Sequence, residues 1–106
     1  MNEELKIKWL AALRSEDYTQ GKDYLCKNNK FCCLGVLCDV IDSSKWVKSM
    51  FTPGAFGYID PICMGGLPVH IGEKFNINSV MQFQLSSMND NGYSFAEIAD
   101  FIEENL

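Results

Sequence analysis

The amino-acid sequence predicts a single α+β domain over residues 1–106, in which three to four helices pack on a small antiparallel sheet. Apolar residues recur at helical spacing near both ends of the chain, which predicts helices there. Residues 44–78 instead hold all three prolines and five of the eight glycines, and these residues break long elements. With 47 % apolar residues, a chain of this length can bury one core.

The N-terminal segment predicts a helix from Glu3 to Arg14, followed by a polar loop at residues 15–23. Asn2 can cap the helix, while the acidic first turn and Arg14 at the end both suit the helix dipole. The apolar residues of this helix form one stripe: Leu5, Trp9, Leu10, Ala12 and Leu13.

Two short strands, at residues 24–27 and 30–33, are predicted to pair as a hairpin. Asn28 and Asn29 lie between them, and asparagine tolerates the positive φ angles that tight hairpin turns require.

A second helix is predicted from Cys33 to about Ser43, because its apolar residues follow the helical period. Gly35 lies inside this helix, where glycine is less favourable than alanine by about 1 kcal/mol. It therefore indicates either a close-packing point or a place where a ligand approaches the backbone.

The segment from residue 44 to residue 78 is predicted to be irregular, with short strands at 46–51, 56–60 and 67–71. A loop this long in a small domain is often functional. A third helix is predicted at residues 80–88, although the alternation of apolar and polar residues at 81–85 fits a strand equally well.

The sequence "NDNG" at residues 89–92 predicts a turn before the last helix. Ser94 and Glu97 have the spacing of a capping box. The apolar stripe of this helix comprises Phe95, Ile98, Ala99, Ile102 and Leu106. Its sequence resembles the first helix of a helix-turn-helix, but it is acidic and the sequence stops at Leu106, so we expect a docked helix and no DNA binding.

The net charge of −5 is unevenly distributed along the chain. Residues 1–48 carry eight basic side chains against seven acids, whereas residues 49–106 carry Lys74 alone against seven acids. An acidic chain disfavours non-specific binding to nucleic acid or anionic lipid, and the longest apolar run is too short to span a membrane. We therefore expect a cytoplasmic protein in which the N-terminal half supplies most of any anion site.

The five cysteines follow the pattern C-x5-C-C-x4-C and then Cys63. Structural zinc sites usually use closely spaced C-x2-4-C pairs, which are absent here, and buried free cysteine commonly packs in cores. Core packing is therefore favoured, and we expect no metal and no cofactor. One alternative stays open, in which Cys33 at a helix start is a nucleophile that pairs with the single histidine, His70.

The stretch "YTQGKDY" at residues 18–24 combines aromatic, amide and basic side chains. Aromatic rings stack on bases, and lysine and backbone amides can meet phosphate. A solvated loop is the alternative interpretation of this stretch, and two further candidates at residues 89 and 90 suit a turn as well as a ligand. The candidate ligand-binding residues are Tyr18, Gln20, Gly21, Lys22, Tyr24, Gly35, Trp46, His70, Asn89 and Asp90.

Three stretches, "WLAALRS", "YTQGKDYLCKNNKFCCLGVLCDV" and "LSSMNDNGYSFAEIADFIEENL", resemble a family of small proteins from tailed bacteriophages and prophages. The resemblance covers residues 9–43 and 85–106 and leaves the middle of the chain unmatched. It implies a location in the cytoplasm of a bacterial host. It also implies a role against bacterial defence, since small phage proteins without enzyme motifs are often inhibitors of host immunity.

The leading hypothesis is a non-catalytic binding protein that sequesters a small anionic, nucleotide-derived signalling molecule. One alternative is a protein–protein inhibitor that acts on a host protein through the acidic C-terminal half. A second alternative is a cysteine-dependent enzyme. A homo-oligomer is left open, because sequestering proteins often build their sites between subunits.

Overall fold

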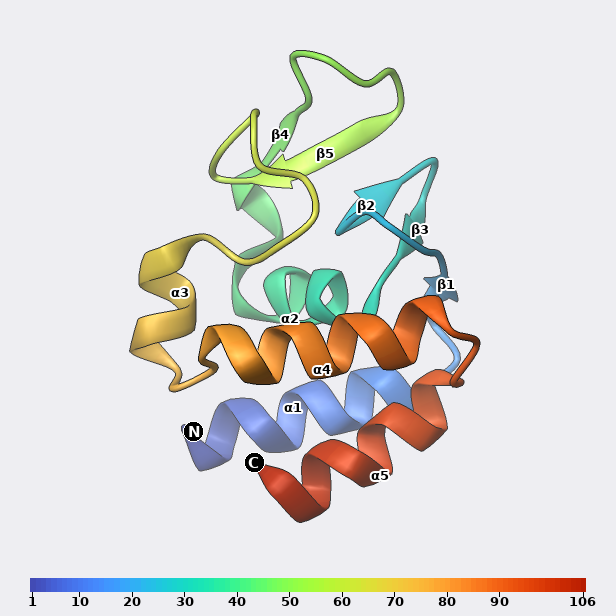
Figure 1. The fold of residues 1–106 in the computed structure, drawn as a ribbon, viewed down its shortest axis with the longest axis vertical. Helices are drawn as coiled ribbons and strands as arrows, with labels where there is room; N and C mark the ends of the chain where they lie inside the picture. The colour runs from blue at the N-terminus through green and yellow to red at the C-terminus, as the bar shows by residue number, and fades with distance from the viewer.

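The computed structural model describes residues 1–106 and confirms the α+β class. Four of the five α-helices gather in one part of the molecule, a five-stranded sheet lies in the other, and the helix Cys33–Asp42 lies between them (Figure 1). The helices are α1 (Glu3–Arg14), α2 (Cys33–Asp42), α3 (Val69–Lys74), α4 (Ser79–Asp90) and α5 (Phe95–Asn105). The strands are β1 (Thr19–Gln20), β2 (Cys26–Lys27), β3 (Lys30–Phe31), β4 (Trp46–Lys48) and β5 (Ala55–Tyr58).

The sheet has the strand order β1-β3-β2-β5-β4 and is mixed rather than purely antiparallel. Three of its pairings are antiparallel, as predicted, but β1 pairs with β3 in parallel. This strand, Thr19–Gln20, falls in a segment predicted as a polar loop. Two residues are too few to produce an alternating pattern, and only the tertiary pairing identifies them as a strand.

The predicted hairpin is confirmed in β2 and β3. Asn28 and Asn29 have φ angles of 53° and 63°, which is the geometry of the two central residues of a type I′ turn. The turn fixes the register that brings Lys27 opposite Lys30. The hairpin therefore places two lysines side by side on neighbouring strands.

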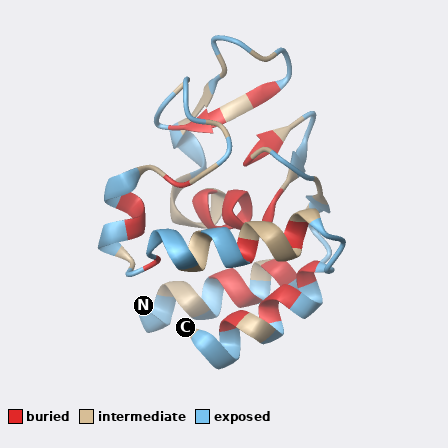
Figure 2. Cartoon of the chain, in the orientation of Figure 1, coloured by how far each residue is buried: buried red, intermediate tan, exposed pale blue.

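Helix α2 forms the centre of the core, and it packs against α1 and α4. All its residues from Cys33 to Cys38 are buried, so it is drawn largely in red in Figure 2. A Cβ atom on Gly35 would lie 1.9 Å from the carbonyl oxygen of Leu25. Gly35 is thus a close-packing point between α2 and the chain entering β2, which corrects its assignment as a ligand contact.

Helices α1 and α5 pack side by side on the face of the molecule that carries both chain ends (Figure 1). The predicted caps are confirmed, since Asn2 accepts from the N–H of Leu5 and Ser94 forms a capping box with Glu97. Arg14 bridges the two helices through Asp100 at 2.7 Å and Glu103 at 3.3 Å. The last helix is therefore docked, as predicted.

Two predicted elements are wrong in type or extent. The predicted strand at 67–71 is largely the short helix α3, which begins directly after Pro68, a residue whose fixed φ suits a helix start. Helix α4 is longer than predicted and excludes a strand at 81–85. It includes Asn89 and Asp90 in its last turn, so these residues do not form the predicted turn. No helix of the protein combines the length and the apolar character needed to cross a bilayer.

Candidate functional site

Asn89 is a buried polar residue that joins the end of α4 to two other parts of the chain. It is 1 % exposed. Its Oδ1 accepts hydrogen bonds from the backbone N–H of Cys33 at 3.2 Å and from Nε2 of Gln20 at 3.0 Å. Its Nδ2 donates to the carbonyl oxygen of Gly21 at 2.7 Å. The side-chain amide is thus fully used inside the protein, so Asn89 holds the loop in place.

The loop at residues 20–23 is anchored to α4 and to the residues after it. Gln20 Nε2 also donates to the carbonyl oxygen of Tyr93 at 2.8 Å, and Asp90 Oδ1 accepts from the backbone N–H of Asp23 at 3.2 Å. Because both partners of the Gln20 amide nitrogen are acceptors, its orientation is fixed. No protein group donates to its Oε1, which leaves that oxygen available to a ligand.

A surface hollow of about 300 Å³, the lysine hollow, lies between this loop and the β2–β3 hairpin. Its lining residues are Gly21, Lys22, Asp23, Tyr24, Lys27, Asn28 and Lys30. None of its three lysines forms a salt bridge, and the ammonium of Lys27 lies 4.6 Å from the centroid of the Tyr24 ring. The hollow carries a formal charge of +2, so the rest of this −5 chain carries −7.

A second hollow of about 220 Å³, the amide hollow, adjoins the first. Its lining residues are Gln20, Lys22, Asn89, Gly92 and Tyr93. Lys22 lines both hollows, and Tyr93 as a residue is 46 % exposed. Five predicted site residues therefore line these two hollows: Gln20, Gly21, Lys22, Tyr24 and Asn89. Asp90 supports them through the Asp23 backbone.

Tyr18 and Trp46 belong to a structural row of aromatic rings instead. Phe31 lies between them, with ring centroids 5.1 Å from Tyr18 and 5.9 Å from Trp46. Tyr18 and Trp46 donate hydrogen bonds to the same carboxylate. Tyr18 Oη donates to Asp39 at 2.6 Å, and Trp46 Nε1 donates to Asp39 at 3.0 Å. Burial, followed by the hydrogen bond to Asp39, raises the pKa of Tyr18. These two predicted ligand contacts therefore stabilise the fold.

Four of the five cysteines are buried, in agreement with the core-packing prediction, whereas Cys63 is exposed. Cys33 is completely buried, and its Sγ lies 3.6 Å from the carbonyl oxygen of Leu85. Burial raises the pKa of this thiol well above its ordinary value, opposite to the lowering expected from a helix start. His70 is exposed on α3 and lines none of the hollows described here. The buried thiol of Cys33 thus argues against the alternative in which this residue is a nucleophile paired with His70.

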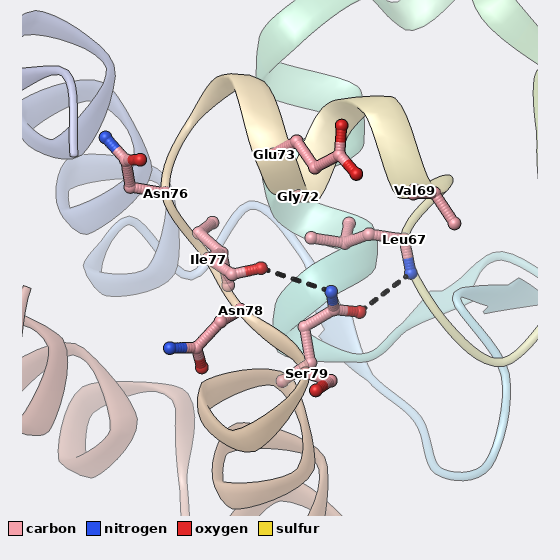
Figure 3. Close-up of a pocket in the computed structure, with 9 residues that line it drawn as sticks. Leu67, Val69, Gly72, Glu73, Asn76, Ile77, Asn78 and Ser79 are labelled. Atoms are coloured by element: carbon pink, nitrogen blue, oxygen red, sulfur yellow. Dashed lines mark hydrogen bonds between the residues drawn. The ribbon is translucent and has the colours of Figure 1, made fainter.

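A third hollow of about 600 Å³, larger than the two described above, is a pocket between α3 and α4 that the sequence did not predict (Figure 3). Its lining residues are Leu67, Val69, Gly72, Glu73, Asn76, Ile77, Asn78, Ser79 and Gln82. It was missed because the strand predicted at 67–71 would have pointed alternate side chains to opposite faces. None of the predicted site residues lines this pocket.

Comparison with known proteins gives one match, to a protein family. The family described as Domain of unknown function (DUF8296) matches the chain over residues 1–106. No curated protein and no solved structure matches it.

Proposed function

The chain belongs to the DUF8296 family, and from the geometry of its surface we propose that it is a non-catalytic protein that binds a small nucleotide-like anion. The observation that carries this proposal is the lysine hollow, where Lys22, Lys27 and Lys30 gather without carboxylate partners. Positive charge concentrated in a hollow raises the local concentration of anions there, even on a molecule that is acidic as a whole. Lysine ammonium groups are also common ligands of phosphate.

The amide hollow supports a nucleotide rather than a bare phosphate. Tyr93 offers a partly exposed ring beside it, and aromatic rings stack on bases. Gln20 Oε1 has no protein donor and can accept a hydrogen bond from an amino group on a base. Lys22 borders both hollows, so one ligand can place its phosphates on the lysines and its base against Tyr93.

Sequestration fits this arrangement better than catalysis. The candidate region has no histidine among its lining residues, and the four cysteines near the core are buried. Together with the resemblance to small phage proteins, this supports a role in which the protein removes a nucleotide-derived immune signal of a bacterial host. The phage role rests on that resemblance.

Calorimetric titration against a panel of cyclic dinucleotides, ADP-ribose derivatives and tripolyphosphate tests the proposal. We expect micromolar binding of at least one nucleotide and weaker binding of tripolyphosphate, because the latter has no base for the amide hollow. Affinity should fall as salt is added, since the lysines are at the surface. The proposal fails if no member of the panel binds at micromolar concentration.

A second candidate function is inhibition of a host protein. Within residues 49–106, three large apolar side chains are mostly exposed in neighbouring loops: Met50 (68 %), Phe51 (69 %) and Ile62 (61 %). A hydrogen bond from the N–H of Met50 to the carbonyl oxygen of Pro61 joins these loops. Exposed apolar clusters often mark protein interfaces. Capture of a defined host protein that survives removal of small molecules, and that Phe51→Ser abolishes, would support this function over the first.

A further inference from the structure

The pocket between α3 and α4 is an open hollow whose floor is apolar. Leu67 and Ile77 are 6 % and 1 % exposed, and both are among the side chains that line the pocket (Figure 3). At about 600 Å³, the pocket falls within the range of about 300–1,000 Å³ that small-molecule sites occupy. Its position on α3 and α4 separates it from the lysine hollow, with which it shares no residue.

A short chain of hydrogen bonds fixes the shape of this pocket. The backbone N–H of Ile77 donates to the carbonyl oxygen of Gly72 at 2.8 Å. The Gln82 amide then bridges the two sides, because its Nε2 donates to Ile77 O and its Oε1 accepts from Leu67 N–H, both at 3.3 Å (dashed in Figure 3). These bonds therefore join lining residues of α3, of α4 and of the segments beside them.

Gly72 is required for this arrangement. A Cβ atom there would lie 2.9 Å from Ile77 O and 3.0 Å from Gln82 Nε2, which are the two atoms of one of these bonds. Any side chain at this position would push them apart. The absence of a side chain thus preserves both the bridge and the space beside it.

The charge of the pocket indicates which ligands it accepts. Glu73 is its single charged lining residue, and this carboxylate has no salt-bridge or hydrogen-bond partner in the protein. The other polar lining groups are amides and one hydroxyl, from Asn76, Asn78, Ser79 and Gln82. No lysine or arginine lines the pocket, so an anion would meet a carboxylate with no compensating positive side chain.

We propose that the α3–α4 pocket is a second binding site, for a small organic cation with an apolar body. The apolar part packs on Leu67 and Ile77, and the positive group pairs with Glu73 at the rim. The site has the opposite charge preference to the lysine hollow and does not depend on the function proposed for that hollow.

Amide chemical-shift mapping with three probes of nearly the same shape tests this site: benzamidinium, benzamide and benzoate. We expect benzamidinium to shift signals within residues 67–82, benzamide to do so more weakly, and benzoate to leave them unchanged. Because Glu73 is at the surface, Glu73→Gln should weaken benzamidinium binding by about three- to fivefold. The same substitution should leave the affinity for benzamide unchanged.

Glu104→Gln is the matched control, since it removes the same charge from an exposed position on α5 that lines none of the hollows described here. It should leave the binding of all three probes unchanged. The proposal is overturned if none of the probes shifts residues 67–82 at millimolar concentration. It is equally overturned if benzoate binds there as tightly as benzamidinium, or if Glu73→Gln and Glu104→Gln act alike.

Discussion

The side-chain oxygen of Asn89 accepts a hydrogen bond from the backbone N–H of Cys33, 3.2 Å away, so the last turn of α4 satisfies a donor in the first turn of α2. The first N–H groups of a helix have no partner within the helix, and this one is buried. The same side chain holds Gln20 and Gly21. Asn89 thereby connects the centre of the core to the loop that lines both hollows.

Replacing Asn89 by alanine should destabilise the protein by about 2–4 kcal/mol. The substitution leaves the buried Cys33 N–H and the half-buried Gly21 carbonyl without this partner, and a buried unpaired group costs about 1–3 kcal/mol. The free energy of unfolding in urea measures this loss. Asn105→Ala removes an exposed asparagine that bonds only within α5 and should change stability by less than about 0.5 kcal/mol. Equal effects of the two substitutions would contradict the role assigned to Asn89.

Alanine at position 35 should be poorly tolerated. Its Cβ would stand 1.9 Å from the carbonyl oxygen of Leu25, so α2 must move away from the chain entering β2, at a cost of about 3 kcal/mol or more. Gly65→Ala is the control, because the nearest atom to its Cβ is 3.6 Å away. The midpoint temperature of thermal unfolding should be clearly lower for Gly35→Ala than for Gly65→Ala. A Gly35→Ala protein that is as stable as the wild type would refute the close packing described here.

In the native protein, one of the five thiols should react with a thiol reagent and the other four should be protected from it. Cys63 is exposed, whereas the other four cysteines are buried. With an aromatic disulfide reagent at neutral pH, we expect one thiol to react rapidly in the native protein and four more only after unfolding. Cys63→Ser should abolish the rapid phase. A rapid phase that persists in this variant would mean that a core cysteine is accessible.

Alkaline solution should destabilise the protein. Burial raises the pKa of Cys32 from 9.0 to about 11 and that of Tyr58 from 10.0 to about 12. Above pH 9 the unfolded chain therefore loses protons that the folded chain retains, and the free energy of unfolding falls as pH rises. Cys32 alone should contribute a loss of roughly 2 kcal/mol by pH 11.

Urea unfolding under reducing conditions from pH 7 to pH 11 measures this dependence. Cys38 is also buried with a raised pKa, so Cys38→Ala should show a smaller loss between pH 9 and pH 11 than the wild type. Cys63→Ala should follow the wild type, because this thiol is exposed. Stability that stays constant or increases across this range would contradict the buried, neutral state of the core thiols.

Local signals in the sequence were sufficient to predict the elements that depend on neighbouring residues. Helix α1 begins and ends where predicted, from Glu3 to Arg14, and the Asn28–Asn29 turn and the Ser94 capping box are as expected. Each of these is fixed within a few residues of chain. The burial of four of the five cysteines was also predicted, since their spacing does not suit a metal.

The parts that escaped prediction depend on contacts between distant residues. Strand β1 exists through its pairing with β3, 11 residues further along the chain. Asn89 looked like a turn residue or a ligand contact, and only the approach of Gln20 and Cys33 gives it a structural role. The lysine hollow needs the hairpin to bring Lys27 and Lys30 beside Lys22; composition alone indicated only that an anion site would lie in this half.

The most direct test of the proposed function is calorimetric titration of the best-binding nucleotide into two double variants of equal charge. Lys22→Gln/Lys30→Gln removes two lysines from the hollow, whereas Lys45→Gln/Lys48→Gln removes two exposed lysines that line none of the hollows described here. We predict that the first variant weakens binding at least tenfold, or about 1.4 kcal/mol, and that the second changes it less than twofold. Equal weakening in both variants, or undiminished binding in the first, would contradict an anion site in the lysine hollow.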